Sequence, residues 1–275
     1  MIKFYPTLYF QIALFYYSIY LLPLGKYSAL YWFSTEAYRH FIMIKPVMLK
    51  TVLLAMTISW IPVSLAVPIT TTALGHNSPT DYINAPYLPY ANPKAPTGGT
   101  LSLDARGTFN SANKWMTTGV AMIGTDYLYD TLMTGSLNEA FTMYPQLANK
   151  VTYDPEDTSW IIYHVDPAAR FWDGSAVTSS DVKATFDALL SKGPMYIRSY
   201  LGDIREVEII DKQRVRFVFA SSDNKEILLT VGQFPIFAKS SIDKDFEKIT
   251  LTPLMGSGPY KLGRVEAGRA VSYVR

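Results

Sequence analysis

The sequence contains no cysteine and only three histidines. The absence of cysteine excludes a disulfide scaffold, a thiol nucleophile and a thiolate metal site. The histidines, His40, His76 and His164, lie far apart in the chain, so their spacing predicts neither a metal site nor a catalytic triad. A Walker loop, a dinucleotide fingerprint, a nucleophile elbow and a zinc motif are also missing. We therefore expect no cofactor, no metal and no enzymatic activity.

The charge is small and unevenly spread. The chain has 25 basic and 23 acidic side chains in 275 residues, which gives a formal net charge of +2. Residues 1–66 hold five of the basic side chains and only one acid, so the remainder of the chain is slightly acidic. Proteins that bind nucleic acid need a clustered basic face. The composition therefore argues against a nucleic-acid partner.

Residues 43–66 have the layout of a secretory signal peptide. Lys45 and Lys50 form a basic n-region, and an uncharged, mostly apolar stretch follows at 51–63. Ser64 and Ala66 put small residues at positions −3 and −1 of a cleavage site. The alternative is a membrane anchor, but the apolar run is shorter than the ~20 residues that span a bilayer.

Residues 1–42 form a hydrophobic extension with two interpretations. The uncharged stretch 5–25 is long enough to cross a bilayer, which would make the protein membrane-anchored. The other interpretation is a start codon assigned too early, with the true start at Met43 or Met48. We favour the second, because a basic pair directly precedes the second apolar run and a protein with two adjacent targeting segments is less economical.

The stretch 160–190 predicts a strand, a turn and a helix. Residues 160–165 are aromatic and β-branched, which favours a strand. Asp173-Gly174 is typical of a tight turn. Thr178 and Asp181 have the spacing of a capping box at the start of a helix. The helix should bury one apolar face and end at Gly193: Val182, Phe186, Leu189 and Leu190.

As a run of identities, this stretch resembles the signature region of the family 5 extracellular solute-binding proteins, which bind oligopeptides and dipeptides for ABC importers. The matching positions are Trp160, Pro167, Phe171, Asp173, Gly174, Val177, Thr178, Asp181, Val182 and Phe186. One departure is Asp166, where the family usually has Arg or Lys; this is a surface-type change. The resemblance implies a fold of mixed α/β sheets, the type II periplasmic-binding-protein fold.

A second motif resembles a narrower branch of that family, the microcin C and oligopeptide-type binding proteins. It reads Tyr-Ala-Asn-Pro-Lys-Ala-Pro-Thr-Gly-Gly over residues 90–99. Alternation then predicts the first strand at 100–105, followed by a loop at 106–111. In the family, this loop lies at the cleft and touches the peptide backbone. The resemblance implies ligand contacts by Arg106, Gly107, Thr108, Phe109 and Asn110; the alternative is an ordinary turn.

Four further elements are expected from local patterns. A helical period runs through 122–134 and ends at Gly135. Residues 206–210 and 214–219 alternate around a three-residue turn, which predicts a β-hairpin. The apolar stretch 227–237 should be a helix that leads into an extended piece at 234–237. Gly-Ser-Gly-Pro-Tyr at 256–260 should open a strand that pairs with 270–274.

A cluster of carboxylates at 154–157 allows a different function. Three carboxylates around a proline are typical of a solvated hairpin turn. A carboxylate-dependent hydrolase that uses this group or Asp173 is the less favoured alternative. A membrane-anchored interaction domain is the other alternative, and it depends on residues 5–25.

Four segments follow from these patterns: a hydrophobic extension (1–42), a signal peptide (43–66), an extended lead-in (67–99) and part of one solute-binding lobe (100–275). Family members are about twice as long and have two lobes, so the resemblance implies a fragment that holds much of lobe I and none of lobe II. We expect the substrate-binding component of an ABC importer, located in the periplasm. Its partners would be a peptide or peptide-like ligand and the permease in the inner membrane.

Overall fold

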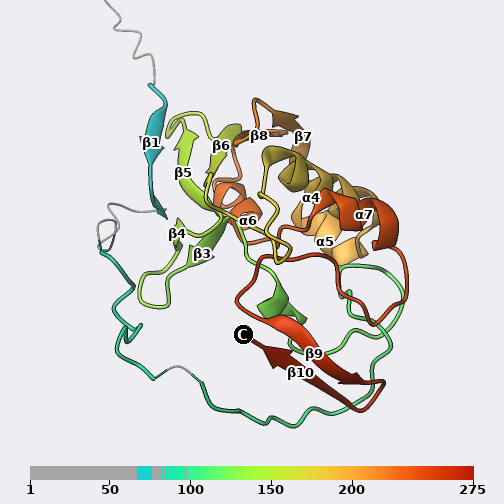
Figure 1. Cartoon of the computed structure of the whole chain (residues 1–275). Helices are drawn as coiled ribbons and strands as arrows, with labels where there is room; N and C mark the ends of the chain where they lie inside the picture. Colours follow the sequence, from blue (N-terminus) through green and yellow to red (C-terminus); the bar gives the residue numbers. More distant parts are fainter. Residues whose placement is uncertain (1–66, 76–81, 83–84, 97) are drawn as a thin grey trace, which may run out of the picture. The chain divides into compact units, whose positions relative to one another are not determined.

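The computed structural model describes residues 67–75, 82, 85–96 and 98–275. The predicted signal peptide at 43–66 and the hydrophobic extension at 1–42 lie outside the described residues. The largest element is a five-stranded antiparallel sheet with the order β1-β5-β6-β8-β7 (Figure 1). Its strands are β1 (Ile69–Thr71), β5 (Ala148–Tyr153), β6 (Trp160–Val165), β7 (Ile204–Ile209) and β8 (Arg214–Phe219).

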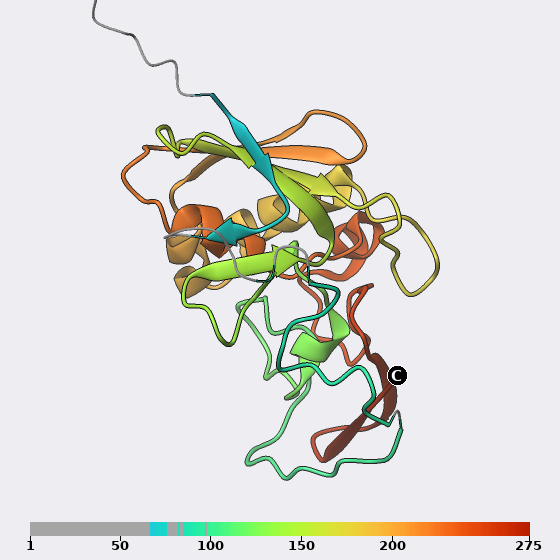
Figure 2. The ribbon, with the colours of Figure 1, turned by 90° about the vertical axis from the view of Figure 1, so that its left-hand side faces the viewer.

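The sheet buries one face because its central strands alternate. In β6, Ile161, Tyr163 and Val165 are buried, while the residues between them are half-buried on the opposite face. Phe217 of β8 lies on the buried face and contacts the Tyr163 ring edge-on at 5.7 Å between centroids. The helices gather on this side of the sheet, so the period of two in each strand creates the core (Figure 2).

The helix α4 (Ser179–Lys192) covers the buried face of this sheet. Its capping box forms as predicted: the Thr178 backbone N–H donates to Asp181 Oδ2 at 2.9 Å. Phe186 is fully buried and packs edge-on against Phe217, with 4.7 Å between ring centroids. Gly193 is the C-cap: its N–H makes the last helical hydrogen bond, to the Leu189 carbonyl, and its ψ of 162° then takes the chain out of the helix. The sequence pattern of the signature region therefore predicted the central strand and helix correctly.

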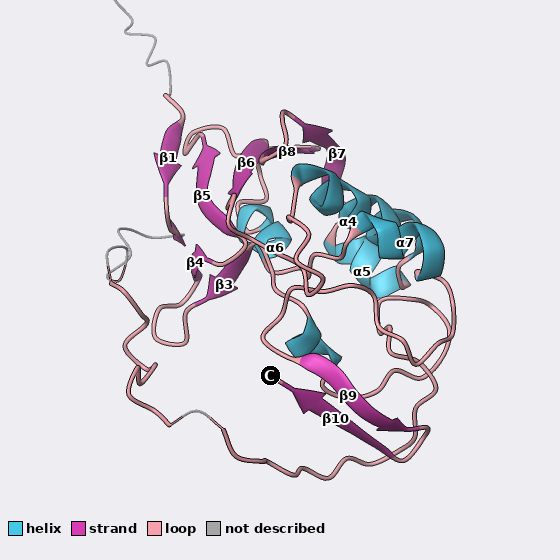
Figure 3. Cartoon of the chain, in the orientation of Figure 1, coloured by secondary structure: helices cyan, strands magenta, loops and turns pink. Residues whose placement is uncertain are grey.

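Two smaller sheets and four short helical segments complete the described part (Figure 3). One sheet has the order β2-β4-β3, and the other is the β9–β10 hairpin. The strands are β2 (Leu74–Gly75), β3 (Met133–Gly135), β4 (Thr142–Pro145), β9 (Lys261–Glu266) and β10 (Ala270–Val274). The helical segments are η1 (Thr125–Leu128), α5 (Met195–Tyr200), α6 (Ile227–Gly232) and α7 (Lys239–Asp245).

Three predicted elements agree with these bounds. The 206–219 hairpin is β7 and β8, and the strand that opens after Tyr260 pairs with 270–274 as β9 and β10. The helix expected within 227–237 is α6, which ends at Gly232, and Pro235 beyond it forms an isolated bridge with Thr131. Two of the strands, β1 and β2, lie inside the 67–99 segment that the sequence predicted as an extended lead-in.

The predicted helix at 122–134 is wrong. Gly124 adopts φ +87°, a left-handed conformation that interrupts a right-handed helix. Only one 3₁₀ turn, η1, follows it, and the chain then becomes extended at Tyr129. From Met133, the segment forms β3 and pairs with β4. Leu128 and Leu132 are buried in the core, whereas Ile123 and Tyr127, which a helix would place on the same face, are exposed.

The predicted first strand at 100–105 is also wrong. These residues have no regular secondary structure, and no described strand pairs with them. Leu101 is 82% exposed and Leu103 is 79% exposed. The alternation that suggested a strand is present, but a strand needs a partner for its backbone N–H and C=O groups.

Candidate ligand-binding site

The loop at 106–110, here called the glycine-bearing loop, lies at the surface. Arg106, Gly107, Thr108 and Asn110 are exposed, and Phe109 is half-buried. Gly107 has φ +115°, a backbone conformation that residues other than glycine rarely adopt. No other atom lies within 4 Å of a Cβ built at this glycine. The backbone of the loop is therefore open to solvent and accessible to a ligand.

Hydrogen bonds of Thr108 and Asn110 hold the middle and the end of this loop. The Thr108 hydroxyl donates to the Gly268 carbonyl at 3.1 Å, in the turn of the β9–β10 hairpin. The Asn110 side-chain oxygen accepts from the Val120 N–H at 2.7 Å, and the Asn110 N–H donates to the Val120 carbonyl at 2.9 Å. The five predicted site residues thus form one exposed, tethered turn, and their contact with a ligand stays a prediction.

Three segments that are far apart in sequence meet at a single junction. The Trp172 indole donates to the Gly258 carbonyl at 3.1 Å, and the Trp172 ring stacks on Tyr129 at 6.4 Å between centroids. The Gly258 N–H donates to the Leu128 carbonyl at 3.1 Å. A Cβ on Gly258 would lie 2.4 Å from the Tyr129 nitrogen, so only glycine fits. The sequence indicated a tight turn at these glycines but not this junction.

The carboxylates proposed for hydrolysis bind their own turns instead. Asp154 is buried, contrary to a fully solvated turn, and its Oδ1 accepts from the Glu156 N–H at 2.9 Å. Asp173 Oδ1 accepts from the Ser175 N–H and hydroxyl at 2.9 and 2.6 Å. These hydrogen bonds lower the pKa of Asp173. A stabilised carboxylate that caps a turn is a weak general base.

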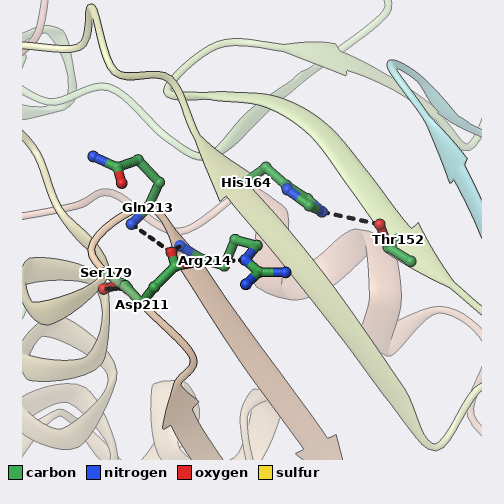
Figure 4. Close-up of polar contacts among 6 residues, drawn as sticks. All are labelled: Thr152, His164, Ser179, Asp211, Gln213 and Arg214. Atoms are coloured by element: carbon green, nitrogen blue, oxygen red, sulfur yellow. Dashed lines mark hydrogen bonds and ion pairs between the residues drawn. The ribbon is translucent and has the colours of Figure 1, made fainter.

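The polar residues at the end of the large sheet also have local partners (Figure 4). Asp211, in the β7–β8 turn, accepts from Arg214 Nε at 2.7 Å and from the Gln213 N–H at 3.0 Å, which lowers its pKa. The His164 ring nitrogen Nε2 lies 2.9 Å from the Thr152 hydroxyl on the neighbouring strand. Burial, followed by nearby positive charge, lowers the pKa of His164. Asp211 therefore stabilises the β7–β8 turn, and His164 bonds to a neighbouring strand of the sheet.

Among the described residues, no group of three or more histidine, aspartate or glutamate side chains is arranged to hold a metal ion. None of the helices in the described part is long and apolar enough to cross a membrane.

Comparison with known proteins identifies the family. Residues 142–275 match the family "Bacterial extracellular solute-binding proteins, family 5 Middle". A binding protein of Brucella melitensis is 36% identical over 208 residues, which are 72% of this chain and 33% of the relative. The chain belongs to the family 5 extracellular solute-binding proteins. It spans about a third of the length of the curated relatives it matches.

Two relatives from Agrobacterium fabrum carry more specific names. "Peptidoglycan-binding protein YepA" is 33% identical over 210 residues, covering 73% of this chain and 34% of the relative. "Probable peptide-binding protein YejA" is 33% identical over 197 residues, covering 69% of this chain and 32% of the relative. These matches to family 5 are to binding proteins rather than enzymes.

A solved structure agrees with the fold. The oligopeptide-binding protein AppA from Bacillus subtilis, in complex with a nonapeptide, aligns with a TM-score of 0.50 at 18% identity. The alignment covers 60% of this chain and 34% of AppA. The predicted fold class, mixed α/β sheets of the periplasmic-binding-protein type, is therefore confirmed for this family 5 chain.

Proposed function

We propose that this family 5 chain supplies the N-terminal part of a substrate-binding component of an ABC importer. Its substrate would be a peptide or a peptide-like compound. The observation that carries this proposal is the family match over residues 142–275 together with relatives that are named for peptide or peptidoglycan binding. Hydrolysis is disfavoured, because the candidate carboxylates hold local turns.

The glycine-bearing loop supports a main-chain mode of recognition. Gly107 leaves the backbone uncovered on an exposed turn, so its N–H and C=O groups can bond to the backbone of an extended peptide. Backbone contacts give affinity without reading side chains, which suits a carrier of many sequences. The proposed contacts are from Arg106, Gly107, Thr108, Phe109 and Asn110.

The cellular setting of the proposal follows from the N-terminal sequence. A signal peptide at 43–66 would export the protein to the periplasm, where a permease in the inner membrane is its partner. Closure of two lobes around the ligand would present the loaded protein to the permease. Within this proposal, the chain supplies one side of the cleft, and the remainder of a full-length binding protein supplies the other.

A hybrid protein tests the proposal. The matching 197-residue region of the Agrobacterium fabrum YejA protein is replaced by the corresponding residues of this chain. Purified hybrid and parent are then titrated with a mixture of random tri- to hexapeptides in a calorimeter. We expect the two affinities to agree within about tenfold. A hybrid that unfolds cooperatively but shows no peptide binding, while the parent binds, would contradict the proposal.

A further inference from the structure

The glycine-bearing loop is attached at its middle to the turn of the β9–β10 hairpin. Thr108 donates its hydroxyl to the Gly268 carbonyl across 160 residues of sequence. Gly268 has φ +69°, and a Cβ at that position would lie 2.7 Å from the Thr108 hydroxyl. The two segments are therefore in close contact, and the glycine leaves room for the threonine.

The following segment attaches the end of the loop to residues 120–123. The N–H groups of Asn110 and Ser111 both donate to the Val120 carbonyl, at 2.9 and 3.0 Å. The Met122 N–H donates to the Ser111 carbonyl at 2.9 Å, which completes a short parallel pairing. Three backbone hydrogen bonds therefore hold residues 110–111 and 120–122 together.

This pair of segments is attached to the open end of the same hairpin through Tyr273 in β10. The Tyr273 hydroxyl donates to the Ile123 carbonyl at 2.6 Å. Its ring packs against Gly124, where a Cβ would lie only 2.8 Å from the ring. The edge of the ring also meets Tyr127, at 6.4 Å between centroids. Burial raises the pKa of Tyr273 to about 12, so its hydroxyl keeps its proton and remains a donor at neutral pH.

We propose that the β9–β10 hairpin positions the glycine-bearing loop for ligand binding, with Thr108 and Tyr273 as positioning residues. Thr108 attaches the middle of the loop to the turn of the hairpin. Tyr273 attaches residues 120–123, and through them the end of the loop, to the open end of the hairpin. This inference rests on the proposed function, because it concerns the same loop. Holding a backbone in its bound conformation raises affinity, since less conformational entropy is lost on binding.

The first test measures the order of the loop in the full chain without ligand. Thr108→Val keeps the shape of the side chain and removes the donor. We expect amide hydrogen exchange of residues 106–111 and tryptic cleavage after Arg106 to rise roughly three- to tenfold, the effect of losing one exposed hydrogen bond. Thr108→Ser should restore both rates, and Thr117→Val, at an exposed site nearby, should change neither.

Tyr273→Phe is the second variant and removes only the hydroxyl at the other end. It should raise exchange of residues 110–111 and 120–123 by a similar factor while the melting temperature changes little. Unchanged exchange in both variants would overturn the proposal. A lower melting temperature together with a similar rise in exchange rate across residues 98–275 would also overturn it. That result would indicate a general structural role for the two side chains.

The peptide-binding hybrid separates this inference from the proposed function. In the hybrid, Thr108→Val should weaken peptide affinity about three- to tenfold through faster dissociation, with rescue by Thr108→Ser. Faster amide exchange in the loop with unchanged peptide affinity would overturn the positioning role. If the unsubstituted hybrid binds no peptide, the proposed function fails, yet the exchange measurements still decide whether the hairpin orders the loop.

Discussion

Gly256, Gly258 and Trp172 contribute mainly through the shape of their contacts. Gly256 and Gly258 are required because the backbone of Leu128 and Tyr129 passes directly above them. Trp172 adds a hydrogen bond and a stacked ring to the same contact. These residues therefore hold three segments of the chain together by close packing.

A methyl group at Gly258 should destabilise the fold strongly. In Gly258→Ala, the new Cβ would lie 2.4 Å from the Tyr129 nitrogen, so the backbone must shift. We expect the free energy of unfolding to fall by about 2 kcal/mol, measured by urea denaturation. Gly135→Ala is the control, because nothing lies within 4 Å of its Cβ. Equal stability of the two variants would refute the close approach.

The stability of the chain should depend on pH through His164. Burial and neighbouring positive charge lower its pKa in the folded state below the usual value of 6.5. The unfolded chain then takes up a proton first as pH falls, so folding stability is complete above pH 6.5 and declines below it. His164→Gln should remove part of this decline between pH 7.5 and 5.5. Identical pH profiles of the two proteins would disprove the assignment.

At the scale of elements, Asp181 connects two helices. Its Oδ2 accepts from the Thr178 N–H and hydroxyl at the start of α4, and its Oδ1 accepts from the Lys239 N–H at the start of α7, at 2.9 Å. The capping box was evident from the sequence. Its second partner was not, because Lys239 is 58 residues away and has no local pattern that points to it.

Asp181→Ala should lower the free energy of unfolding by more than the loss of an ordinary helix cap does. It removes acceptors from two helix starts, so we expect a loss of about 2 kcal/mol in the free energy of unfolding, against about 1 kcal/mol for a single cap. Thr178→Ser keeps the hydroxyl and the backbone donor and should change stability little. Thermal and urea denaturation measure both. A loss in Asp181→Ala no larger than in Thr178→Ser would contradict the double role.

The elements that the sequence predicted are those whose partners are local. The capped helix α4 and the hairpins β7–β8 and β9–β10 depend on residues close in sequence, and their patterns were sufficient. The failures depend on distant partners or on a backbone conformation. Leu101 and Leu103 alternate as in a strand but have no described strand beside them, and the left-handed Gly124 interrupts an otherwise helical pattern.

The candidate site was predicted only as a run of five residues. In the structure the loop is largely exposed and Gly107 has a positive φ that favours glycine, while ligand contact by the loop stays a prediction. Its attachment to the β9–β10 hairpin through Thr108 and Gly268 had no sequence signal, because a single hydroxyl-to-carbonyl contact across 160 residues leaves no local pattern. The hairpin itself was predicted, but its relation to the loop required the coordinates.

At the scale of the whole molecule, the chain belongs to the family 5 solute-binding proteins, and export by residues 43–66 stays a prediction from the sequence. The chain spans about a third of the length of the curated relatives it matches. Residues 142–275 match the family model, and the glycine-bearing loop at 106–110 lies outside this matched range. The proposed function therefore rests on the family, and the proposed contacts rest on the loop.

Export predicts a defined mature N-terminus. If residues 43–66 are a signal peptide, signal peptidase should cleave after Ala66, where Ser64 supplies the small residue at −3. Intact-mass measurement of the protein from a periplasmic extract should give a chain that starts at Val67. A protein recovered from membranes with Met1 at its N-terminus would instead favour the membrane-anchored alternative.

Photo-crosslinking in the peptide-binding hybrid tests the central claim most directly. A benzophenone amino acid replaces Arg106 in the glycine-bearing loop or, as a control, Leu137, which is 81% exposed between β3 and β4. After irradiation with the random peptide mixture, mass spectrometry locates the adducts. We predict peptide adducts at position 106 and none at 137. A hybrid that binds peptide but forms no adduct at 106, or equal adducts at both positions, would contradict the ligand-contacting role of the loop.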